Sequence, residues 1–373
     1  MEIIFDPNRI CPKCMLENEN RNEVCPHCGF YLPDYTEQRH YLPMETILKG
    51  RYLLGSVLGE GGFGITYSAY DLQNERRVAI KELFIAGVVS RQGGRTVLMD
   101  TGKEIRRYYQ ECRNKFLQEA KVLQMLQDKR GVVTIYDFFQ ENDTAYIVME
   151  YLDGIDLKLF LKQNGGRISY QSTCRFLWPI MKSLMEIHRN GIIHRDISPD
   201  NIRYLSNKQM KLMDFGSAKF IEAERTESIA ILFKPGYTPP EQYTSGYMIG
   251  PWMDVYAMAA TIYRCITGKP PKISIERKDD SDLESPRSLG ADISPQAEAV
   301  LYKGMALNPE NRYLDMRSFY EALKNAGAEE VWETDHGQAA EGWEIKRKKS
   351  FSWVYAVAAV ELLLIIIVVF WLR

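Results

Sequence analysis

The alternation of apolar and polar positions predicts one large domain over residues 51–325, with a strand-rich half followed by a helix-rich half. Short apolar runs with a glycine-rich turn between the first two predict strands. The predicted strands lie within 52–70, 77–83 and 144–150. Apolar residues recur at helical spacing elsewhere, and the predicted helices span 115–127, 175–189 and 254–267. The pattern therefore favours an α+β fold.

Other segments flank this domain. Residues 1–30 hold four of the seven cysteines, and 31–50 is typical of a linker, with prolines and many polar groups. Residues 326–350, first acidic and then basic, are typical of a solvated juxtamembrane linker. The net charge of -2 gives no general attraction for nucleic acid, and we expect no nucleic-acid partner. The N-terminus lacks the basic and apolar regions of a signal peptide.

The apolar run over 351–372 predicts a transmembrane helix. Its core, Val354 to Leu372, spans 19 residues and is about 28 Å long as a helix, close to the ~30 Å of a hydrocarbon core. The basic cluster 346–349 precedes it, so the positive-inside rule predicts a single-pass cell-membrane protein whose large domain is cytoplasmic. Only Arg373 follows the run.

Glu361 interrupts this apolar run near its middle. A carboxyl group at the midplane of a bilayer is costly by a few kcal/mol. Glu361 is therefore either protonated or paired across a helix–helix contact, and the second alternative implies self-association of the chain.

A glycine-rich turn is the first motif with chemical meaning. It consists of Leu58, Gly59, Glu60, Gly61, Gly62, Phe63, Gly64, Ile65 and Thr66. Three of its glycines follow the G-x-G-x-x-G spacing, which lets a backbone approach phosphates because no Cβ intervenes. Alone, the spacing also fits a flexible hairpin or a dinucleotide fold, although the latter expects a helix after the glycines and here a strand-like run follows.

Lys81 ends the apolar strand that follows the glycine-rich turn. It is either an edge-strand lysine that points to water or an ammonium that binds phosphate. Its position behind the glycine-rich turn favours the second interpretation.

Three further motifs follow in order: His194-Arg195-Asp196, Asp214-Phe215-Gly216 and Pro239-Pro240-Glu241. Together with the glycine-rich turn and Lys81, they resemble the ordered signatures of the protein kinase superfamily. The resemblance covers about residues 50–325 and is strongest for bacterial eukaryotic-like (Hanks-type) serine/threonine kinases, because tyrosine kinases usually carry alanine and arginine where this chain has Ser198-Pro199.

The resemblance implies a two-lobed kinase fold, with ATP and Mg²⁺ at the site and protein hydroxyl groups as acceptors. It assigns catalytic roles to Asp196 as base, to Lys81 as phosphate ligand and to Glu119 as the partner of Lys81. It makes Asn201 and Asp214 the Mg²⁺ ligands, because Mg²⁺ prefers oxygen donors.

The same resemblance assigns the nucleotide pocket and some structural residues. Besides the glycine-rich turn, the implied ATP-binding residues are Ala79, Lys81, Glu150 and Leu152. It also implies that Asp254 supports the catalytic loop, and that Glu241 and Arg312 form a buried ion pair.

One departure from the family pattern concerns the catalytic lysine. Most serine/threonine kinases carry lysine where this chain has Ser198, and threonine where it has Lys234. In the family fold these two positions touch beside the catalytic aspartate. We therefore expect Lys234 to supply the missing ammonium; the alternative is a solvated lysine in a slower enzyme.

Two further segments have open roles. Residues 84–114, which include Arg91 and other basic residues, resemble an insertion that is either a docking surface or a solvated loop. Thr226 and Ser228 are candidate phosphate acceptors, and Arg195 is the residue that would receive such a phosphate.

The cysteines at the N-terminus form two C-x₂-C pairs, Cys11 with Cys14 and Cys25 with Cys28. Four thiolates in this pattern close a tetrahedral Zn²⁺ site and resemble a zinc ribbon. A redox pair or an iron–sulfur site are the alternatives. A segment of about 30 residues has little core of its own, so the metal would supply its folding energy.

The leading hypothesis is thus a membrane-anchored serine/threonine protein kinase with an N-terminal zinc ribbon. A pseudokinase scaffold is one rival, supported by Ser198 alone. A zinc-ribbon adaptor regulated by an appended kinase domain is the other.

Overall fold

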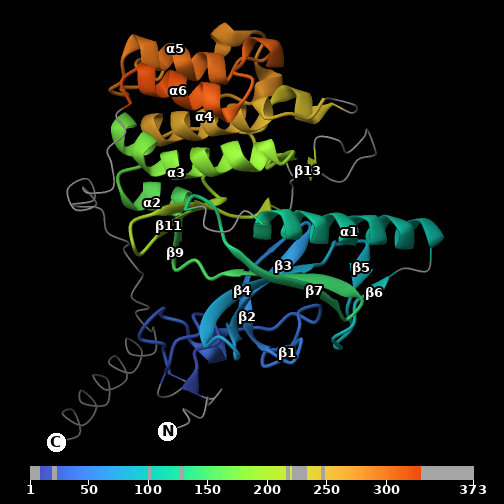
Figure 1. Cartoon of the computed structure of the whole chain (residues 1–373). Helices are drawn as coiled ribbons and strands as arrows, with labels where there is room; N and C mark the ends of the chain where they lie inside the picture. Colours follow the sequence, from blue (N-terminus) through green and yellow to red (C-terminus); the bar gives the residue numbers. More distant parts are fainter. Residues whose placement is uncertain are drawn as a thin grey trace, which may run out of the picture.

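The computed structural model describes residues 9–18, 23–99, 102–125, 130–215, 219–220, 233–244 and 248–328. Figure 1 shows a sheet-based N-terminal lobe and, beyond it, a helical C-terminal lobe. Apolar side chains from both lobes form one continuous core. The strand-rich half therefore precedes the helix-rich half, as the sequence predicts.

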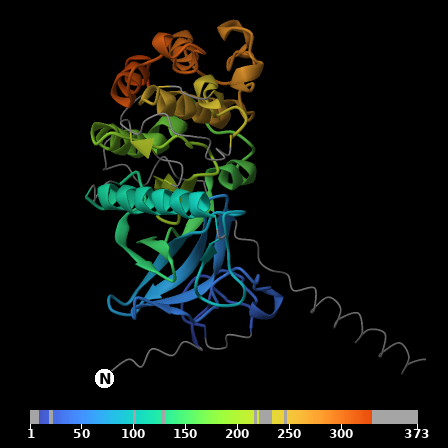
Figure 2. The same ribbon diagram turned by 90° about the vertical axis from the view of Figure 1, so that its right-hand side faces the viewer.

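The N-terminal lobe is built on a six-stranded antiparallel sheet with the order β1-β2-β3-β4-β8-β7. The strands are β1 (Ile47–Leu48), β2 (Tyr52–Gly61), β3 (Gly64–Asp71), β4 (Arg76–Leu83), β7 (Ile135–Glu141) and β8 (Thr144–Glu150). A small hairpin of β5 (Val89–Ser90) and β6 (Leu98–Met99) precedes α1 (Lys103–Met125). Helix α1 packs on β7 and β8, between the sheet and the helical lobe (Figures 1 and 2).

The C-terminal lobe contains five of the described α-helices and two small sheets. Its helices are α2 (Leu157–Gln163), α3 (Tyr170–Arg189), α4 (Trp252–Thr267), α5 (Pro295–Gly304) and α6 (Met316–Asn325). Its strands are β9 (Gly154–Asp156), β10 (Ile192–Ile193), β11 (Ile202–Leu205), β12 (Met210–Leu212) and β13 (Lys219–Phe220). Strands β12, β11 and β9 form one sheet, and β10 pairs with β13.

Local sequence signals set the limits of the central helices. Helix α3 begins after Ser169, whose side chain accepts the N–H of Ser172 and so satisfies a free donor of the first turn. Helix α4 ends at Gly268, which takes a left-handed φ of 83°. Helix α4 is buried along almost its whole length, and it is the central element of this lobe.

Helix α1 is longer than the sequence pattern predicts. It begins at Lys103, so residues 103–114 are helical and the predicted insertion ends much earlier. Tyr109 explains this start: its buried hydroxyl donates to the Leu83 carbonyl at 3.0 Å and contacts Thr144 Oγ1 at 2.8 Å. Many charged residues surround Tyr109 in the sequence, so the sequence pattern does not show that this side chain is buried.

Residues 31–50, whose composition is typical of a linker, are packed against the sheet. Strand β1 pairs with β2, and the side chains of Leu42 and Leu48 are fully buried. The backbone N–H of Leu42 donates to the Tyr67 hydroxyl at 3.0 Å. Prolines and polar residues hide the few apolar side chains that anchor this segment.

Among the described residues, no helix is long and apolar enough to span a membrane. The predicted helix 351–372, with Glu361, lies outside the described residues, as does the basic cluster 346–349. Thr226 and Ser228 lie outside them too.

Arg91, predicted to belong to a solvated loop or docking surface, is instead at the centre of a buried network. The side chains of Arg91 and Glu82 are both 0% exposed and form an ion pair. Tyr67 and Tyr146 each donate a hydroxyl to Glu82, at 3.0 Å. Arg91 also donates to the His40 carbonyl at 2.7 Å, so the network ties residues 31–50 to β3, β4 and β8.

Replacing Arg91 by alanine should lower the free energy of unfolding by about 3–5 kcal/mol, because Glu82 would be left as a buried charge without its partner. Urea denaturation of the full-length protein measures the loss. Arg107→Ala is the matched control: Arg107 is 84% exposed in its ion pair with Glu111, and its removal should cost less than about 0.5 kcal/mol. Equal losses in the two variants would contradict the assignment.

Candidate active site

The glycine-rich turn is the hairpin between β2 and β3. Gly61 pairs with Gly64, so Gly62 and Phe63 form the tip of the turn. A Cβ on Gly64 would lie 2.3 Å from the Glu82 carbonyl oxygen, so this position requires glycine. Because a strand and not a helix follows the glycines, the arrangement differs from a dinucleotide-binding turn.

The residues predicted to bind the nucleotide lie on strands next to this hairpin. Ala79 on β4 pairs with Met149 on β8, and β8 ends at Glu150, two residues before the buried Leu152. The Glu150 carboxylate accepts from Lys211 at 2.5 Å, which fixes the end of β8 against β12. The hairpin and the end of β8 thus lie on the same sheet, as an ATP site between lobes requires.

Lys81 on β4 extends to the opposite lobe. Its ammonium contacts the carboxylate of Asp214. The expected ion pair of Lys81 with Glu119 stays a prediction. Glu119 lies on α1 and is 8% exposed. Its assignment as a catalytic residue stays a prediction.

The catalytic loop follows β10 and brings Asp196 and Asn201 together. The Asn201 side-chain amide donates to the Asp196 carbonyl at 2.7 Å and to its Oδ2 at 2.8 Å. The Met213 N–H donates to the Asn201 carbonyl at 2.9 Å, which ties this loop to the segment that carries Asp214. The candidate base Asp196 and the candidate metal ligands Asn201 and Asp214 therefore lie on two loops that hydrogen bonds connect.

Lys234 reaches the same loop from the activation segment, the part of the chain between the Asp214-Phe215-Gly216 and Pro239-Pro240-Glu241 motifs. Its Nζ lies 3.0 Å from Ser198 Oγ and 3.1 Å from Asp196 Oδ1. Its backbone N–H donates to Thr238 Oγ1 at 2.9 Å, which holds the residue beside the loop. Lys234 therefore contacts Ser198, the position at which the family pattern has lysine, and it is not a fully solvated lysine. That its ammonium replaces the missing one stays a prediction.

The comparisons with known proteins agree with this geometry. The family described as "Protein kinase domain" matches residues 52–318. The chain belongs to this family.

Several bacterial kinases are similar to this kinase domain. Serine/threonine-protein kinase PknA of Nostoc sp. is 31% identical over 75% of the chain, and PknB of Mycolicibacterium smegmatis is 30% identical over 71%. The chain spans only 48% and 41% of the lengths of these two relatives. A solved structure titled "PpkA-294 apo form" superposes with a TM-score of 0.65 at 32% identity, over 76% of this chain and 99% of that one.

A buried carboxylate supports the catalytic loop of the kinase domain. Asp254, 0% exposed on α4, accepts the backbone N–H groups of His194 at 2.9 Å and Arg195 at 2.8 Å. It also contacts His188 Nε2 at 2.8 Å. Burial alone would raise the pKa of Asp254, but the hydrogen bonds from His188 and the Arg195 backbone hold it below its ordinary value. The expected support of the loop by Asp254 is confirmed.

The expected ion pair between Glu241 and Arg312 is also confirmed. The two guanidinium N–H groups of Arg312 donate to the two Glu241 oxygens at 2.6 and 2.8 Å. Arg312 is 3% exposed and donates to carbonyls of the helical lobe as well, so the pair is structural.

His194 in the catalytic loop is neutral, and hydrogen bonds to both ring nitrogens set its orientation. Burial lowers the pKa of His194 below its ordinary value. Its Nδ1 accepts the Asp196 N–H at 3.3 Å, which leaves Nε2 as the donor to the Met213 carbonyl at 3.2 Å. The ring packs edge-on against Phe215, with centroids 4.5 Å apart. His194 therefore connects the catalytic loop to the Asp214 segment.

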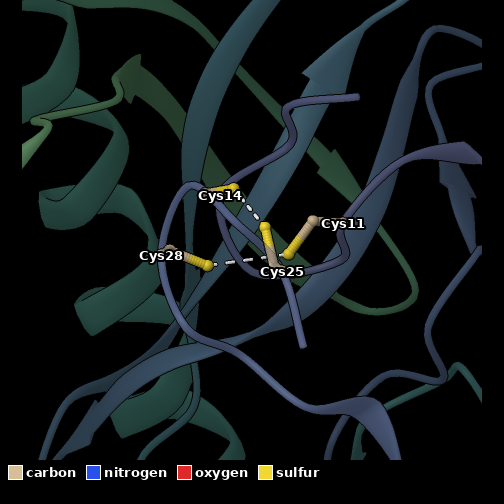
Figure 3. A group of neighbouring side chains, drawn as sticks. All are labelled: Cys11, Cys14, Cys25 and Cys28. Carbon is tan, nitrogen blue, oxygen red and sulfur yellow. Dashed lines mark hydrogen bonds between the residues drawn. The ribbon is translucent and has the colours of Figure 1, made fainter. Parts of the chain in front are cut away.

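Four cysteines form a second candidate site, which Figure 3 shows. Their sulfur atoms all lie within 4.8 Å of one another. Cys11 and Cys28 are 3.7 Å apart, as are Cys14 and Cys25. Tetrahedral Zn–S bonds of about 2.3 Å require sulfur separations of about 3.8 Å, whereas a disulfide requires about 2.05 Å. The cluster therefore fits zinc and does not contain a disulfide.

Two similar backbone turns present these thiols. In the first cysteine turn, residues 11–16, the Met15 N–H donates to the Cys11 carbonyl at 2.9 Å; in the second, residues 25–30, the Gly29 N–H donates to the Cys25 carbonyl at 2.8 Å. Met15 and Gly29 both take left-handed φ values, 55° and 70°. The repeated geometry is the backbone counterpart of the repeated C-x₂-C spacing.

Sequence reasoning missed two residues beside the glycine-rich turn. His40 Nε2 and the Tyr41 hydroxyl each lie 2.9 Å from the carboxylate of Glu60. Burial and the neighbouring Glu60 raise the pKa of Tyr41 to about 12, so its hydroxyl stays protonated and donates. These residues belong to the segment 31–50, whose linker-like composition gives no signal of such contacts.

Lys234 should control the protonation of Asp196. Burial raises the pKa of Asp196 above its ordinary value, and the charge of Lys234 opposes this rise. As the predicted base, Asp196 would accept a proton only when it is deprotonated, so activity is expected to fall as pH falls through its pKa. In Lys234→Met the pKa should rise further, and the acidic limb of kcat/KM should move to higher pH.

Initial rates of phosphoryl transfer over a pH series measure this limb. Arg107→Ala, which removes an exposed charge on α1, is the control and should leave the limb in place. An acidic limb that stays at the same pH in Lys234→Met would show that the ammonium does not act on Asp196.

Proposed function

We propose that this chain is a serine/threonine protein kinase that transfers the γ-phosphoryl group of ATP to protein hydroxyl groups. The observation that supports this most is the contact of Lys234 with both Ser198 and Asp196. It completes a set that already contains Lys81, Asn201 and Asp214, and it weakens the one sequence argument for a pseudokinase. The serine/threonine-protein kinases that the chain resembles support the same acceptor class.

Each residue has a defined part in this reaction. Asp196, oriented by Asn201, accepts the proton of the substrate hydroxyl. Lys81 and Lys234 offer ammonium groups from opposite sides of the site for the charge of the transferred phosphoryl group. Asn201 and Asp214 offer oxygen donors for Mg²⁺, which when bound would neutralise phosphate charge. The glycine-rich hairpin covers the phosphates.

Exchanging the residue types at positions 198 and 234 tests the role of Lys234. Lys234→Ala should lower kcat by about 10²-fold, the usual cost of removing one group that stabilises the transition state. The double variant Ser198→Lys/Lys234→Thr restores the arrangement common in the family and should recover most of this loss.

The assay is phosphoryl transfer from labelled ATP with Mg²⁺, followed by mapping of the phosphorylated residues. Asp196→Asn is the inactive control. If Lys234→Ala is as active as the wild type, Lys234 has no catalytic role; if the wild-type protein transfers no phosphate, the chain is a pseudokinase.

We propose further that the four cysteines hold a structural Zn²⁺ ion. The sulfur separations and the burial of the cluster support this assignment. Metal analysis should find about one zinc per chain. Cys25→Ser should lose the metal and Cys112→Ser, which alters a cysteine of α1 outside the cluster, should keep it. Iron in place of zinc, or a metal-free wild-type protein, would refute the assignment.

Residues 351–372 are proposed to anchor the kinase to the cell membrane, with the kinase domain in the cytoplasm. The length of the apolar run and the basic cluster 346–349 support this. After cell fractionation the protein should remain in the membrane pellet under alkaline carbonate, and truncation after residue 345 should move it to the soluble fraction with its kinase activity retained. A soluble full-length protein would exclude the anchor.

A further inference from the structure

The first cysteine turn packs directly on the nucleotide-binding lobe. The Pro12 carbonyl accepts the backbone N–H of Ser56 on β2 at 2.7 Å and the hydroxyl of Ser68 on β3 at 2.5 Å. The pairing of β2 with β3 is irregular between Leu54 and Val57, the stretch that contains Ser56. The strand that leads into the glycine-rich hairpin therefore obtains one of its hydrogen-bond partners from the cysteine turn.

Gly55 provides the space for this contact. A Cβ at this position would lie 2.0 Å from the Pro12 carbonyl oxygen and 2.1 Å from the methyl group of Met15. Met15 is 3% exposed, so its side chain is buried by the contact with the sheet. Any larger residue at position 55 would have to displace the cysteine turn.

The same turn also contacts β4, through Arg77, and the segment that follows β8, through Tyr151. Arg77 donates to the Cys14 carbonyl at 3.4 Å, and the Tyr151 hydroxyl donates to the Lys13 carbonyl at 3.4 Å. The Arg77 guanidinium lies 5.0 Å from the centre of the Tyr151 ring and 3.8 Å from Asp153. Tyr151 lies between Glu150 and Leu152, two of the predicted ATP-binding residues.

The chain between the cysteines and β1 adds contacts at the other end of the pocket. The Tyr35 hydroxyl accepts the Val57 N–H at 3.2 Å, just before the glycine-rich turn. His40 and Tyr41 contact Glu60 within that turn. The first cysteine turn and residues 35–41 therefore contact two parts of the predicted nucleotide site, the glycine-rich hairpin and the end of β8.

We propose that the zinc-loaded cysteine cluster is a positioning module of the nucleotide site: metal binding holds the first cysteine turn on β2 and raises the affinity of the kinase for ATP. The proposal rests on the zinc and nucleotide sites proposed above. The cluster has a small core of its own, Cys11, Cys14 and Cys25 with a few partly buried neighbours. Without metal, such a segment loses its main source of folding energy.

Two variants separate docking from metal binding. Met15→Ala weakens the contact from the cysteine turn, and Gly55→Ala weakens it from β2; neither alters a metal ligand. Both should keep about one zinc per chain and bind a fluorescent ATP analogue about tenfold more weakly, within the usual range of coupling between sites. Gly94→Ala is the control, because a Cβ there meets nothing within 4 Å.

Hydrogen exchange of residues 9–18 shows whether docking is lost in each variant. Unchanged nucleotide affinity in Met15→Ala, with these amides exchanging faster, would overturn the proposal. Gly55→Ala alone could fail through damage to β2, but Met15→Ala leaves the sheet sequence intact and keeps the test decisive.

Reciprocity gives an independent measurement, because coupling between two binding sites acts equally in both directions. Competition of the full-length protein with a zinc chelator should show about tenfold tighter zinc binding when ADP and Mg²⁺ are present. Equal zinc affinity with and without nucleotide would overturn the proposal. A wild-type protein without zinc would refute the zinc site, and one that binds no nucleotide would refute the kinase function.

Discussion

The catalytic loop depends on one buried carboxylate, that of Asp254. It is 0% exposed and accepts two successive backbone N–H groups of the loop while it contacts a histidine of α3. These bonds hold Arg195 at a positive φ of 68°, a conformation that costs energy for a residue with a side chain. The strain is tolerated because α4, which carries Asp254, is packed on all sides. The direction in which Asp196 points is thereby set by the core of the helical lobe.

The charges of the site form two pairs that join separate parts of the chain. Lys81 and Asp214 link the lobes, and Lys234 and Asp196 link the activation segment to the catalytic loop. An ammonium that neutralises a carboxylate in the ligand-free site is also available to a phosphate, because it can exchange one oxygen partner for another. Nucleotide binding would therefore redistribute existing charge pairs and would not bring unpaired charges into a partly buried site.

The sequence predicted the motifs and their order better than it predicted the packing between them. Strand β8 has the predicted bounds, and Lys234 lies beside Ser198 as expected. Such features can be predicted because glycine spacing, the period of apolar residues and charged motifs are properties of the local sequence or of the family. The buried pair of Arg91 with Glu82 and the start of α1 at Lys103 were missed. In both cases a charged or polar surrounding suggests solvent exposure, and only the tertiary fold shows that the partner is buried nearby. The packing of residues 31–50 on the sheet is likewise hidden by a composition that is typical of a linker.

The cysteine cluster packs on the sheet because it is too small to be stable alone. Two short turns around four thiols cannot bury enough apolar surface to be stable alone, so they require a metal, a supporting surface or both. Strand β2 offers that surface at Gly55, where the absent side chain admits Met15 and the Pro12 carbonyl. The contact is unlike that of a separate domain on a linker, since backbone groups of the turn satisfy backbone and hydroxyl groups of the sheet. Loss of the turn would leave Ser56 and Ser68 without these partners at the base of the glycine-rich hairpin. The packing of the cysteine cluster and the geometry of β2 and β3 therefore depend on the same contacts.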